Sequence, residues 1–146
     1  MLEIREIKNN IEQIKSFYKA VFTIEPWNDD WSDDNQLQQY ITDLTGNANS
    51  LTFGLFRGDE MVGLSMGKIM HWYTGTQYYI DEFCIKTSEQ GSGLGTHFLN
   101  CVVDCIKDRG IKQIYLQTDR TLPAFKFYQK NGFLLLENQV SMVKDF

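Results

Sequence analysis

The sequence predicts one domain of the mixed α/β class that spans residues 1–146. A chain of 146 residues is long enough to bury one core. Hydrophobic residues make up 42% of the chain and charged residues 23%, which is a globular composition and not that of a disordered chain. Segments with the period of strands are interspersed with segments with the period of helices, and no repeat or linker divides them.

The chain begins with one expected strand and two expected helices. Residues 2–7 (LEIREI) alternate apolar and polar side chains, which predicts a half-buried strand. Over residues 11–22 the apolar side chains recur at steps of three and four, which predicts an amphipathic helix. A second apolar stripe over residues 37–44 predicts another helix, with Ser32 or Asp33 as its N-cap.

The middle of the chain is rich in strand signals. Residues 51–57 and 61–70 read as two strands, and the Gly-Asp pair at 58 and 59 between them is a hairpin signal. Residues 78–85 combine aromatic and β-branched side chains and predict a third strand of this group.

The last third of the chain is expected to alternate helices and strands. A loop over residues 87–95 leads into a helix with an apolar face over residues 94–106, and a short strand follows at 113–117. A brief helix is predicted over residues 122–130, because Pro123 favours a helix start and Asn131-Gly132 a helix end. The final segment, 133–146, predicts two closing strands.

Charge and composition exclude several classes of function. The net charge is −5 and no lysine or arginine cluster is present, so we expect no nucleic-acid partner. No apolar run approaches the roughly 20 residues of a membrane span, and the first residues lack a signal-peptide layout, so a cytoplasmic location is expected. The three cysteines then predict free thiols. Cys101 and Cys105 are one helical turn apart, but they lack the further ligands of a metal site, so no metal is expected.

A glycine-rich turn, QGSGLG at residues 90–95, joins the third strand of the middle group to the next helix. At a helix start the first N–H groups have no partner, and glycines allow an anion to reach them. The turn therefore predicts a phosphate site, although alternating glycines also occur in plain flexible loops. It comes too late in the chain for a Rossmann site, and it lacks the Gly-Lys-Ser/Thr ending of a nucleoside-triphosphate loop.

Around this turn the sequence resembles the GCN5-related N-acetyltransferase (GNAT) family, and the resemblance covers nearly the whole chain. Gln90, Gly93 and Gly95 match the family signature Gln/Arg-x-x-Gly-x-Gly/Ala. Residues 123–133 resemble a second family segment, Ala-x-x-x-Tyr-x-x-x-Gly-Phe. The resemblance implies a central, mostly antiparallel sheet with one splayed strand pair, flanked by four helices.

The resemblance also implies that acetyl-CoA is the cofactor. The N–H groups of the loop would hold its pyrophosphate, and backbone groups of Phe83 and Ile85, on the splayed strand, would pair with its pantetheine arm. Thr121 stands where many members have Asn, and its hydroxyl could still reach the cofactor. The expected cofactor-binding residues are Phe83, Cys84, Ile85, Gln90, Gly91, Ser92, Gly93, Leu94, Gly95, Thr96, Thr121 and Phe125.

Two adjacent carboxylates, Asp81 and Glu82, interrupt an otherwise apolar strand. Acetyl transfer to an amine needs a proton acceptor, and burial among aromatic side chains raises the pKa of a carboxylate toward the range of a useful base. Neighbouring side chains of a regular strand leave opposite faces, so only one of the two faces the acceptor. We favour Glu82, with Asp81 as the alternative; either could instead be solvated or paired with a lysine or arginine.

Tyr128, in the second segment, matches the tyrosine that is proposed to protonate the CoA thiolate in this family. The alternative is an aromatic residue of the core, whose hydroxyl must still find a partner. Cys84 is not expected to form an acyl-enzyme, because no His lies nearby in the sequence to activate its thiol.

The segment over residues 25–34 (EPWNDDWSDD) lies between the first two helices, where this family commonly has the border of its acceptor pocket. Its carboxylates and indoles suit a cationic or polar amine. Alternatively, the indoles close the core and the aspartates cap helices. Some family members with a similar Pro-Trp segment are aminoglycoside acetyltransferases. The expected substrate-binding residues are Trp27, Asp30, Trp31, Trp72 and Tyr73.

The resemblance and these residues together predict transfer of an acetyl group from acetyl-CoA to a small primary amine, such as an aminosugar or polyamine. A strand carboxylate would act as the base and Tyr128 as the acid. One alternative is an enzyme for protein N-termini or lysines, which needs an open peptide groove. Another is a CoA-binding sensor without turnover. Apolar residues of the closing strands could also support a homodimer.

Overall fold

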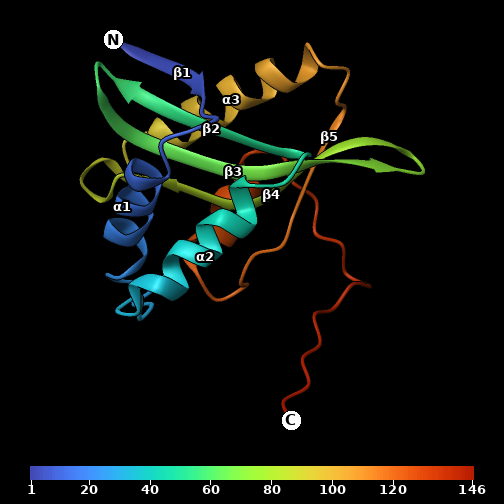
Figure 1. Ribbon diagram of the computed structural model, residues 1–146. Helices are drawn as coiled ribbons and strands as arrows, with labels where there is room; N and C mark the ends of the chain where they lie inside the picture. The colour runs from blue at the N-terminus through green and yellow to red at the C-terminus, as the bar shows by residue number, and fades with distance from the viewer.

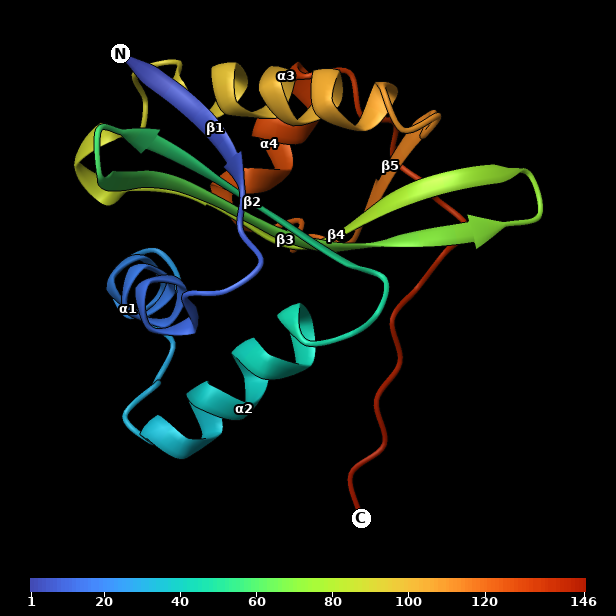
Figure 2. The ribbon, with the colours of Figure 1, turned by 45° about the horizontal axis from the view of Figure 1, so that its top comes forward.

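The computed structural model describes residues 1–146 as one sheet covered by helices on both faces (Figures 1 and 2). The strands are β1 (Leu2–Glu6), β2 (Ser50–Arg57), β3 (Glu60–Trp72), β4 (Gly75–Ile85) and β5 (Gln113–Leu116). The helices are α1 (Ile11–Phe22), α2 (Asp34–Thr45), α3 (Leu94–Lys107) and α4 (Pro123–Lys130), with a 3-10 turn η1 (Thr87–Glu89) before α3. Helices α1 and α2 cover one face, and α3 and α4 cover the other (Figure 2).

Local sequence signals account for the helix ends. Asp33, and not Ser32, is the N-cap of α2, and its carboxylate accepts a hydrogen bond from the Gln36 N–H at 3.1 Å. Gly46 follows the same helix and donates its N–H to the Thr42 carbonyl. No helix of the structure combines the length and apolar character needed to cross a bilayer.

The strands follow the order β1-β2-β3-β4-β5, and β1 to β4 pair with one another in antiparallel fashion. β5 is parallel to β4 and pairs with it only from Gln77–Gln113 to Ile80–Leu116. β4 continues to Ile85 without a partner on that side, so the expected splayed strand pair is confirmed. The splay opens one edge of β4 directly before the glycine-rich loop.

Each face of the sheet has its own hydrophobic core. The buried residues toward α1 and α2 include Ile14, Leu37, Ile41, Leu64 and Met66. Those toward α3 include Leu55, Val62, Tyr78, Phe98 and Val102. Two cores hold the sheet rigidly between the helix pairs, which suits a site built from the ends of its central strands.

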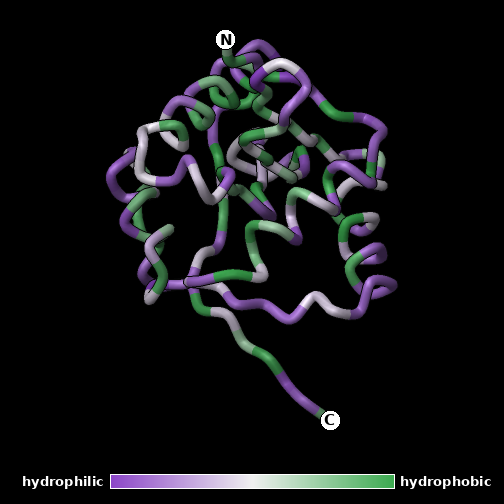
Figure 3. Tube along the Cα trace, turned by 90° about the vertical axis from the view of Figure 1, so that its left-hand side faces the viewer, coloured by the Kyte–Doolittle hydropathy of each residue, from purple (hydrophilic) through white to green (hydrophobic).

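The prediction of two closing strands over residues 133–146 is wrong. The segment contains no strand. Beyond Phe133, the only N–H group that donates to a backbone carbonyl is that of Gln139, which bonds to the Leu136 carbonyl at 3.2 Å. The end of the chain runs away from the body to the C-terminus (Figures 1 and 3). Alternating apolar side chains give this segment the propensity of a strand, but a strand also needs a neighbouring backbone with free groups.

Candidate active site

The glycine-rich loop presents free backbone N–H groups at the start of α3. Gly91 and Gly93 have φ values of 79° and 87°, a left-handed conformation that favours glycine, and a Cβ at either position would point into open space. None of the N–H groups of residues 91–96 donates a hydrogen bond within the chain. Gln90 closes the loop by donating from Nε2 to the Ile85 carbonyl at 3.0 Å. The loop therefore has the geometry of an anion site.

Two further contacts fix this loop against the body. Glu89 accepts two hydrogen bonds from the Arg57 guanidinium, at 2.7 and 2.8 Å, which ties η1 to the end of β2. At Gly95 an added Cβ would lie 3.0 Å from the Phe127 ring, so this glycine allows α3 to approach α4 closely. The loop is thus held in place on both sides.

The last residues of β4 offer backbone groups to an added chain. The Lys86 N–H donates to the Val62 carbonyl on β3 at 2.9 Å. Because hydrogen bonding alternates along an antiparallel strand, the backbone groups of Phe83 and Ile85 face the opposite, open side. Gln90 occupies the Ile85 carbonyl, and the Ile85 N–H and both backbone groups of Phe83 stay free. This arrangement fits the pantetheine arm that the sequence led us to expect there.

Glu82 carries the carboxylate that lies deepest among the aromatic residues of this region. Its Oε1 accepts hydrogen bonds from the Tyr40 hydroxyl at 2.6 Å and from the Tyr18 hydroxyl at 3.3 Å. Burial raises the pKa of Glu82 above its usual range, and the two hydroxyl groups lower it in part. Burial and the nearby Glu82 also raise the pKa of both tyrosines, so their hydroxyls stay protonated as donors.

Asp81 lies on the same face of the sheet as Glu82, because β4 is bulged. The register with β3 shifts between Met66 and Gly67, which leaves Asp81 without a cross-strand partner. Lys68 shares the face of Met66, and its Nζ lies 3.2 Å from Asp81 Oδ1. The expectation that the two carboxylates leave opposite faces is therefore wrong. Asp81 is paired with a lysine, whereas Glu82 has only neutral partners.

Tyr128, on α4, lies on the other side of the β4 end. Its ring is buried against Phe83 and Phe133, with centroid separations of 6.4 and 5.1 Å. Burial raises the pKa of the Tyr128 hydroxyl, and the nearby Cys84 and Glu82 raise it further. Burial also raises the pKa of the Cys84 thiol, so this thiol stays protonated. Tyr128 is therefore near enough to Cys84 and Glu82 for their charges to act on its hydroxyl.

The remaining predicted donor-side residues lie at the start of α4. The Thr121 hydroxyl donates to Asp119 Oδ1 at 2.6 Å, and this bond orders the turn before the helix. The Phe125 ring lies 5.6 Å from the Arg120 guanidinium carbon. Both residues are more exposed than Tyr128, and Thr121 already has a hydrogen-bond partner within the chain.

The structure separates the predicted acceptor residues into two groups. Trp31 stacks on Tyr40 at 5.3 Å and so adjoins Glu82, while Trp27 packs edge-on against Phe22. The Trp31 Nε1 is buried without a hydrogen-bond partner. Asp30 is exposed in a local turn. Trp31 is thus beside the candidate base, and Trp27 closes the core under α1.

Trp72 and Tyr73 form the second group, at the tip of the β3–β4 hairpin. Their side chains are 57% and 87% exposed and pack mainly on each other, with ring centroids 5.2 Å apart. The hairpin projects beyond the helices, away from the α1–α2 segment (Figures 1 and 2). The structure therefore does not bring these two residues to Glu82.

Sequence reasoning missed Tyr18, Tyr40 and Asp29. Both tyrosines lie on the apolar faces of α1 and α2, and a buried phenol needs a hydrogen-bond partner, which was the available signal. Asp29 lies near enough to Glu82 for its charge to raise the pKa of Glu82. Nothing in the sequence spacing of these three residues indicates that they meet.

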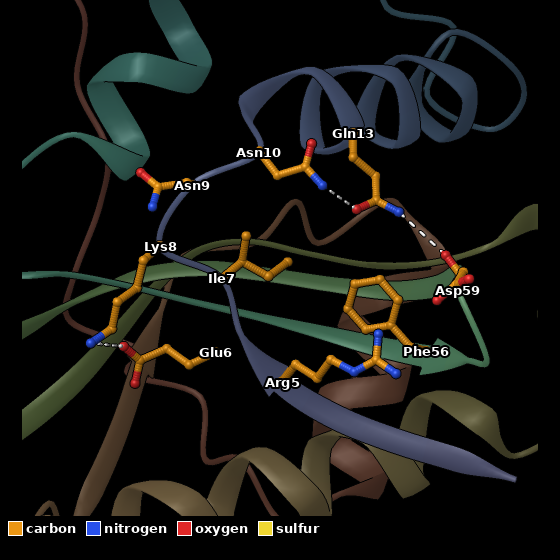
Figure 4. A pocket seen from close by; sticks show the side chains of 9 residues that line it. All are labelled: Arg5, Glu6, Ile7, Lys8, Asn9, Asn10, Gln13, Phe56 and Asp59. Atoms are coloured by element: carbon orange, nitrogen blue, oxygen red, sulfur yellow. Dashed lines mark hydrogen bonds and ion pairs between the residues drawn. The ribbon is translucent and has the colours of Figure 1, made fainter.

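Two other clusters lie apart from these residues. A cavity of about 470 Å³ between β1 and α1 is lined by charged and amide side chains, among them Arg5, Lys8 and Gln13, and by none of the predicted site residues (Figure 4). On α3, His97 Nε2 lies 3.7 Å from Cys101 Sγ, with no third side chain that completes a metal-ligand group.

Comparisons with known proteins show the family and the fold of the chain. Residues 11–133 match the model of the acetyltransferase (GNAT) family. The aminoglycoside acetyltransferase meta-AAC0020 from an uncultured soil metagenomic sample, solved with sisomicin, is 20% identical, with a TM-score of 0.75 over 99% of this chain and 96% of that chain. AAC(6')-Iy with the bisubstrate analogue CoA-S-monomethyl-acetylneamine is 15% identical, with a TM-score of 0.76 over 100% and 99% of the two chains.

A "possible acetyltransferase" from Clostridium difficile 630 is 16% identical and has a TM-score of 0.81 over 100% of this chain and 99% of that chain. A search of curated protein sequences gave no match. At such low identities the solved structures show a shared fold alone. The family model, in contrast, matches most of the chain. The chain therefore belongs to the GNAT family of acetyltransferases.

Proposed function

We propose that this enzyme transfers the acetyl group of acetyl-CoA to the primary amine of a small cationic or polar acceptor, of the aminosugar or polyamine kind. The observation that carries the proposal is the position of Glu82. A buried carboxylate with a raised pKa lies beside an open strand edge and next to a loop with free N–H groups, in a chain of an acetyltransferase family. These parts supply a base, a donor site and an anion site in one place.

The donor side rests on main-chain groups. The N–H groups of residues 91–96 would hold the pyrophosphate of acetyl-CoA, with the positive end of α3 behind them. The free backbone groups of Phe83 and Ile85 would pair with the pantetheine arm as an added strand does. The complex of AAC(6')-Iy with a CoA-containing analogue supports the same donor on this fold.

The acceptor side rests on charge and aromatic surface. Glu82 and Asp29 carry negative charge next to Trp31 and Tyr40, whose rings are stacked. Carboxylates attract an ammonium group, and aromatic faces bind cations and the apolar faces of sugar rings. The relatives solved with sisomicin and with an acetylneamine analogue support an amine of this class.

In the reaction, the amine nitrogen forms a bond to the acyl carbon and the carbon–sulfur bond breaks. Glu82 accepts the proton that the amine gives up, which a carboxylate with a raised pKa does well near neutral pH. Tyr128 donates a proton to the departing sulfur; its high pKa keeps the proton on the hydroxyl until the thiolate forms. Asp81 is paired with Lys68 and is not assigned a step in this reaction.

The test is an acetylation panel that measures thiol release with aminosugars, polyamines, neutral amines and acidic amines. We expect cationic acceptors to exceed acidic amines by at least about tenfold in kcat/KM, since one unfavourable charge contact costs about 1.4 kcal/mol or more. Glu82→Gln should lower kcat by about 10²- to 10⁴-fold, while the matched Asp81→Asn should stay within a few-fold of wild type. Equal rates for acidic and cationic amines would contradict the acceptor class, and an active Glu82→Gln enzyme would contradict the base.

A further inference from the structure

A lysine of β3 lies beside the two carboxylates of β4. The Nζ of Lys68 is 3.2 Å from Asp81 Oδ1, and the same Nζ lies 4.5 Å from the centre of the Tyr79 ring. Carboxylates and aromatic faces are the groups with which proteins bind an ammonium ion. Asp81 and Tyr79 therefore form an ammonium site, and the chain's own lysine fills it.

This ammonium site adjoins Glu82, the proposed base. Met66 pairs with Glu82 across the sheet, and Lys68 follows Met66 by two residues, so Met66 and Lys68 share the face that α1 and α2 cover. The charge of Asp81 acts on this region, because it raises the pKa of both Glu82 and Tyr40. Two residues along a strand span about 7 Å, so the lysine lies one such step along the sheet from the base.

Solvent reaches the Lys68–Asp81 pair, so a bound acceptor can contact it. The exposed fractions of the two side chains are 34% and 15%. The lysine ammonium makes one hydrogen bond within the chain, to Asp81 Oδ1, which leaves two of its N–H groups and the second carboxylate oxygen for a ligand.

The pair suits a hydroxyl group better than a second ammonium group. A hydroxyl accepts a hydrogen bond from the ammonium of Lys68 and donates one to the carboxylate of Asp81 at the same time. An ammonium group of the acceptor is repelled by the lysine. If it displaced the lysine from Asp81, the tethered positive charge would stay close by.

We propose that Lys68 determines the acceptor class. The enzyme acetylates amines that carry a hydroxyl group at the distance of the Lys68–Asp81 pair, and it discriminates against diamines with a second ammonium group there. The inference rests on the proposed function and narrows it, from aminosugars and polyamines to amino alcohols of the aminosugar kind. Lys68 acts on the choice of acceptor and not on the transfer step.

Two acceptors that differ in one group provide the test. Cadaverine and 5-aminopentanol both present a primary amine on a five-carbon chain, and the far end bears a second ammonium group in the first and a hydroxyl in the second. Their chain length is close to the step of about 7 Å between Glu82 and Lys68 along the sheet. For wild type, we expect kcat/KM for 5-aminopentanol to exceed that for cadaverine at least about tenfold in a thiol-release assay. Both are measured on one enzyme preparation, so partial unfolding leaves their ratio unchanged.

Variants of Lys68 should change this ratio according to their charge. Lys68→Met removes the positive charge and frees Asp81, so kcat/KM for cadaverine should rise at least about tenfold. The KM for 5-aminopentanol should rise because a hydrogen-bond donor is lost, with little change in kcat. Lys68→Arg keeps the charge and should keep the preference for the amino alcohol. In Lys68→Met/Asp81→Asn, cadaverine should lose its gain, because its second ammonium group then has no carboxylate partner.

Lys8→Met is the control for a change in net charge. Lys8 is paired with Glu6 and is 79% exposed, and it lies by the separate cavity between β1 and α1. Its replacement should leave the ratio of the two kcat/KM values within about twofold of wild type, because solvent and salt screen so exposed a charge. A change as large as that in Lys68→Met would show an effect of net charge and would overturn the inference.

The other outcomes separate this inference from the proposed function. An equal ratio in wild type and Lys68→Met, or a preference of wild type for cadaverine, would overturn the inference while the enzyme still acetylates amines. The same holds if 5-aminopentanol is not acetylated by an enzyme that acetylates other amines. If wild type releases no thiol with any amine of the panel, the proposed function and the inference are both wrong.

Discussion

Replacing Tyr40 by Phe tests how the structure sets the pKa of the candidate base. The Tyr40 hydroxyl donates a 2.6 Å hydrogen bond to the Glu82 carboxylate, while the ring also stacks on Trp31. Phe keeps the ring and removes only the donor. A hydrogen bond to a charged group contributes about 1.5–3 kcal/mol, and it stabilises the ionised form. Its loss should raise the pKa of Glu82 further above its usual range, in the same direction as burial.

The assay is the pH dependence of kcat/KM for the best cationic acceptor. The acid limb of the profile should move to higher pH by about one to two pH units, because 1.4 kcal/mol corresponds to a tenfold change in proton affinity. Below this limb the Tyr40→Phe enzyme should be about 10- to 100-fold slower, and at the alkaline plateau it should approach wild type. Tyr18→Phe, which removes the longer 3.3 Å contact, should shift the limb less. A uniform loss at every pH, or a shift to lower pH, would refute the reasoning.

Three further predictions follow from the same geometry. Glu82→Gln should unfold at a higher temperature than wild type at pH 7–8, because the pKa of Glu82 is raised in the folded state and wild type therefore loses stability as the pH rises through that pKa. The difference in melting temperature should vanish below about pH 4, where Glu82 is protonated in both the folded and the unfolded state. A lower melting temperature of the variant at pH 8 would contradict the burial argument. Tyr128→Phe should lower kcat by about 10- to 1000-fold with little change in KM, and unchanged turnover would return Tyr128 to a packing role. Gly93→Ala and Gly110→Ala both place a Cβ in open space at a residue with positive φ, so each should lower the free energy of unfolding by about 1 kcal/mol. Only Gly93→Ala should weaken CoA binding in calorimetry. Equal CoA affinities of the two variants would contradict the anion site.

The parts of the site that come from one stretch of chain could be predicted from the sequence. The glycines at 91 and 93 indicated left-handed backbone at a helix start, and the structure has it there. Glu82 was favoured over Asp81 as a buried carboxylate, and in the structure Glu82 is the one with neutral, buried partners. Such features depend on residue type, which is read directly from the sequence, and on local conformation, which short sequence patterns indicate.

The parts that depend on contacts between distant segments could not be predicted. Tyr18 and Tyr40 meet Glu82 only because α1 and α2 pack on the same face of the sheet. The bulge at Asp81 alters the strand alternation, and the glycine beside it, Gly67, lies on the facing strand, so the sequence of β4 itself does not mark the position. The C-terminal segment has the pattern of strands but no backbone partner within its own chain, and pattern alone says nothing about partners.

The positions of Trp72 and Tyr73, away from the candidate site, also depend on how distant segments pack. Trp72 and Tyr73 follow β3 in the sequence, and Glu82 lies on the next strand, β4, so the sequence suggested that they are close together. β3 and β4 extend well past the helices, so the hairpin tip lies far from the α1–α2 segment (Figure 1). The length of a hairpin relative to the body is set by which residues the helices cover, and that depends on the tertiary fold.

The central claim is that the open edge of β4 and the loop after it hold acetyl-CoA through main-chain groups. The most direct measurement is amide hydrogen exchange, read residue by residue by NMR, with and without acetyl-CoA. The account predicts new protection at Phe83, at Ile85 and over residues 91–96, and little change at Lys86, whose N–H already bonds to β3. No response at millimolar acetyl-CoA, or protection confined to other parts of the chain, would contradict it.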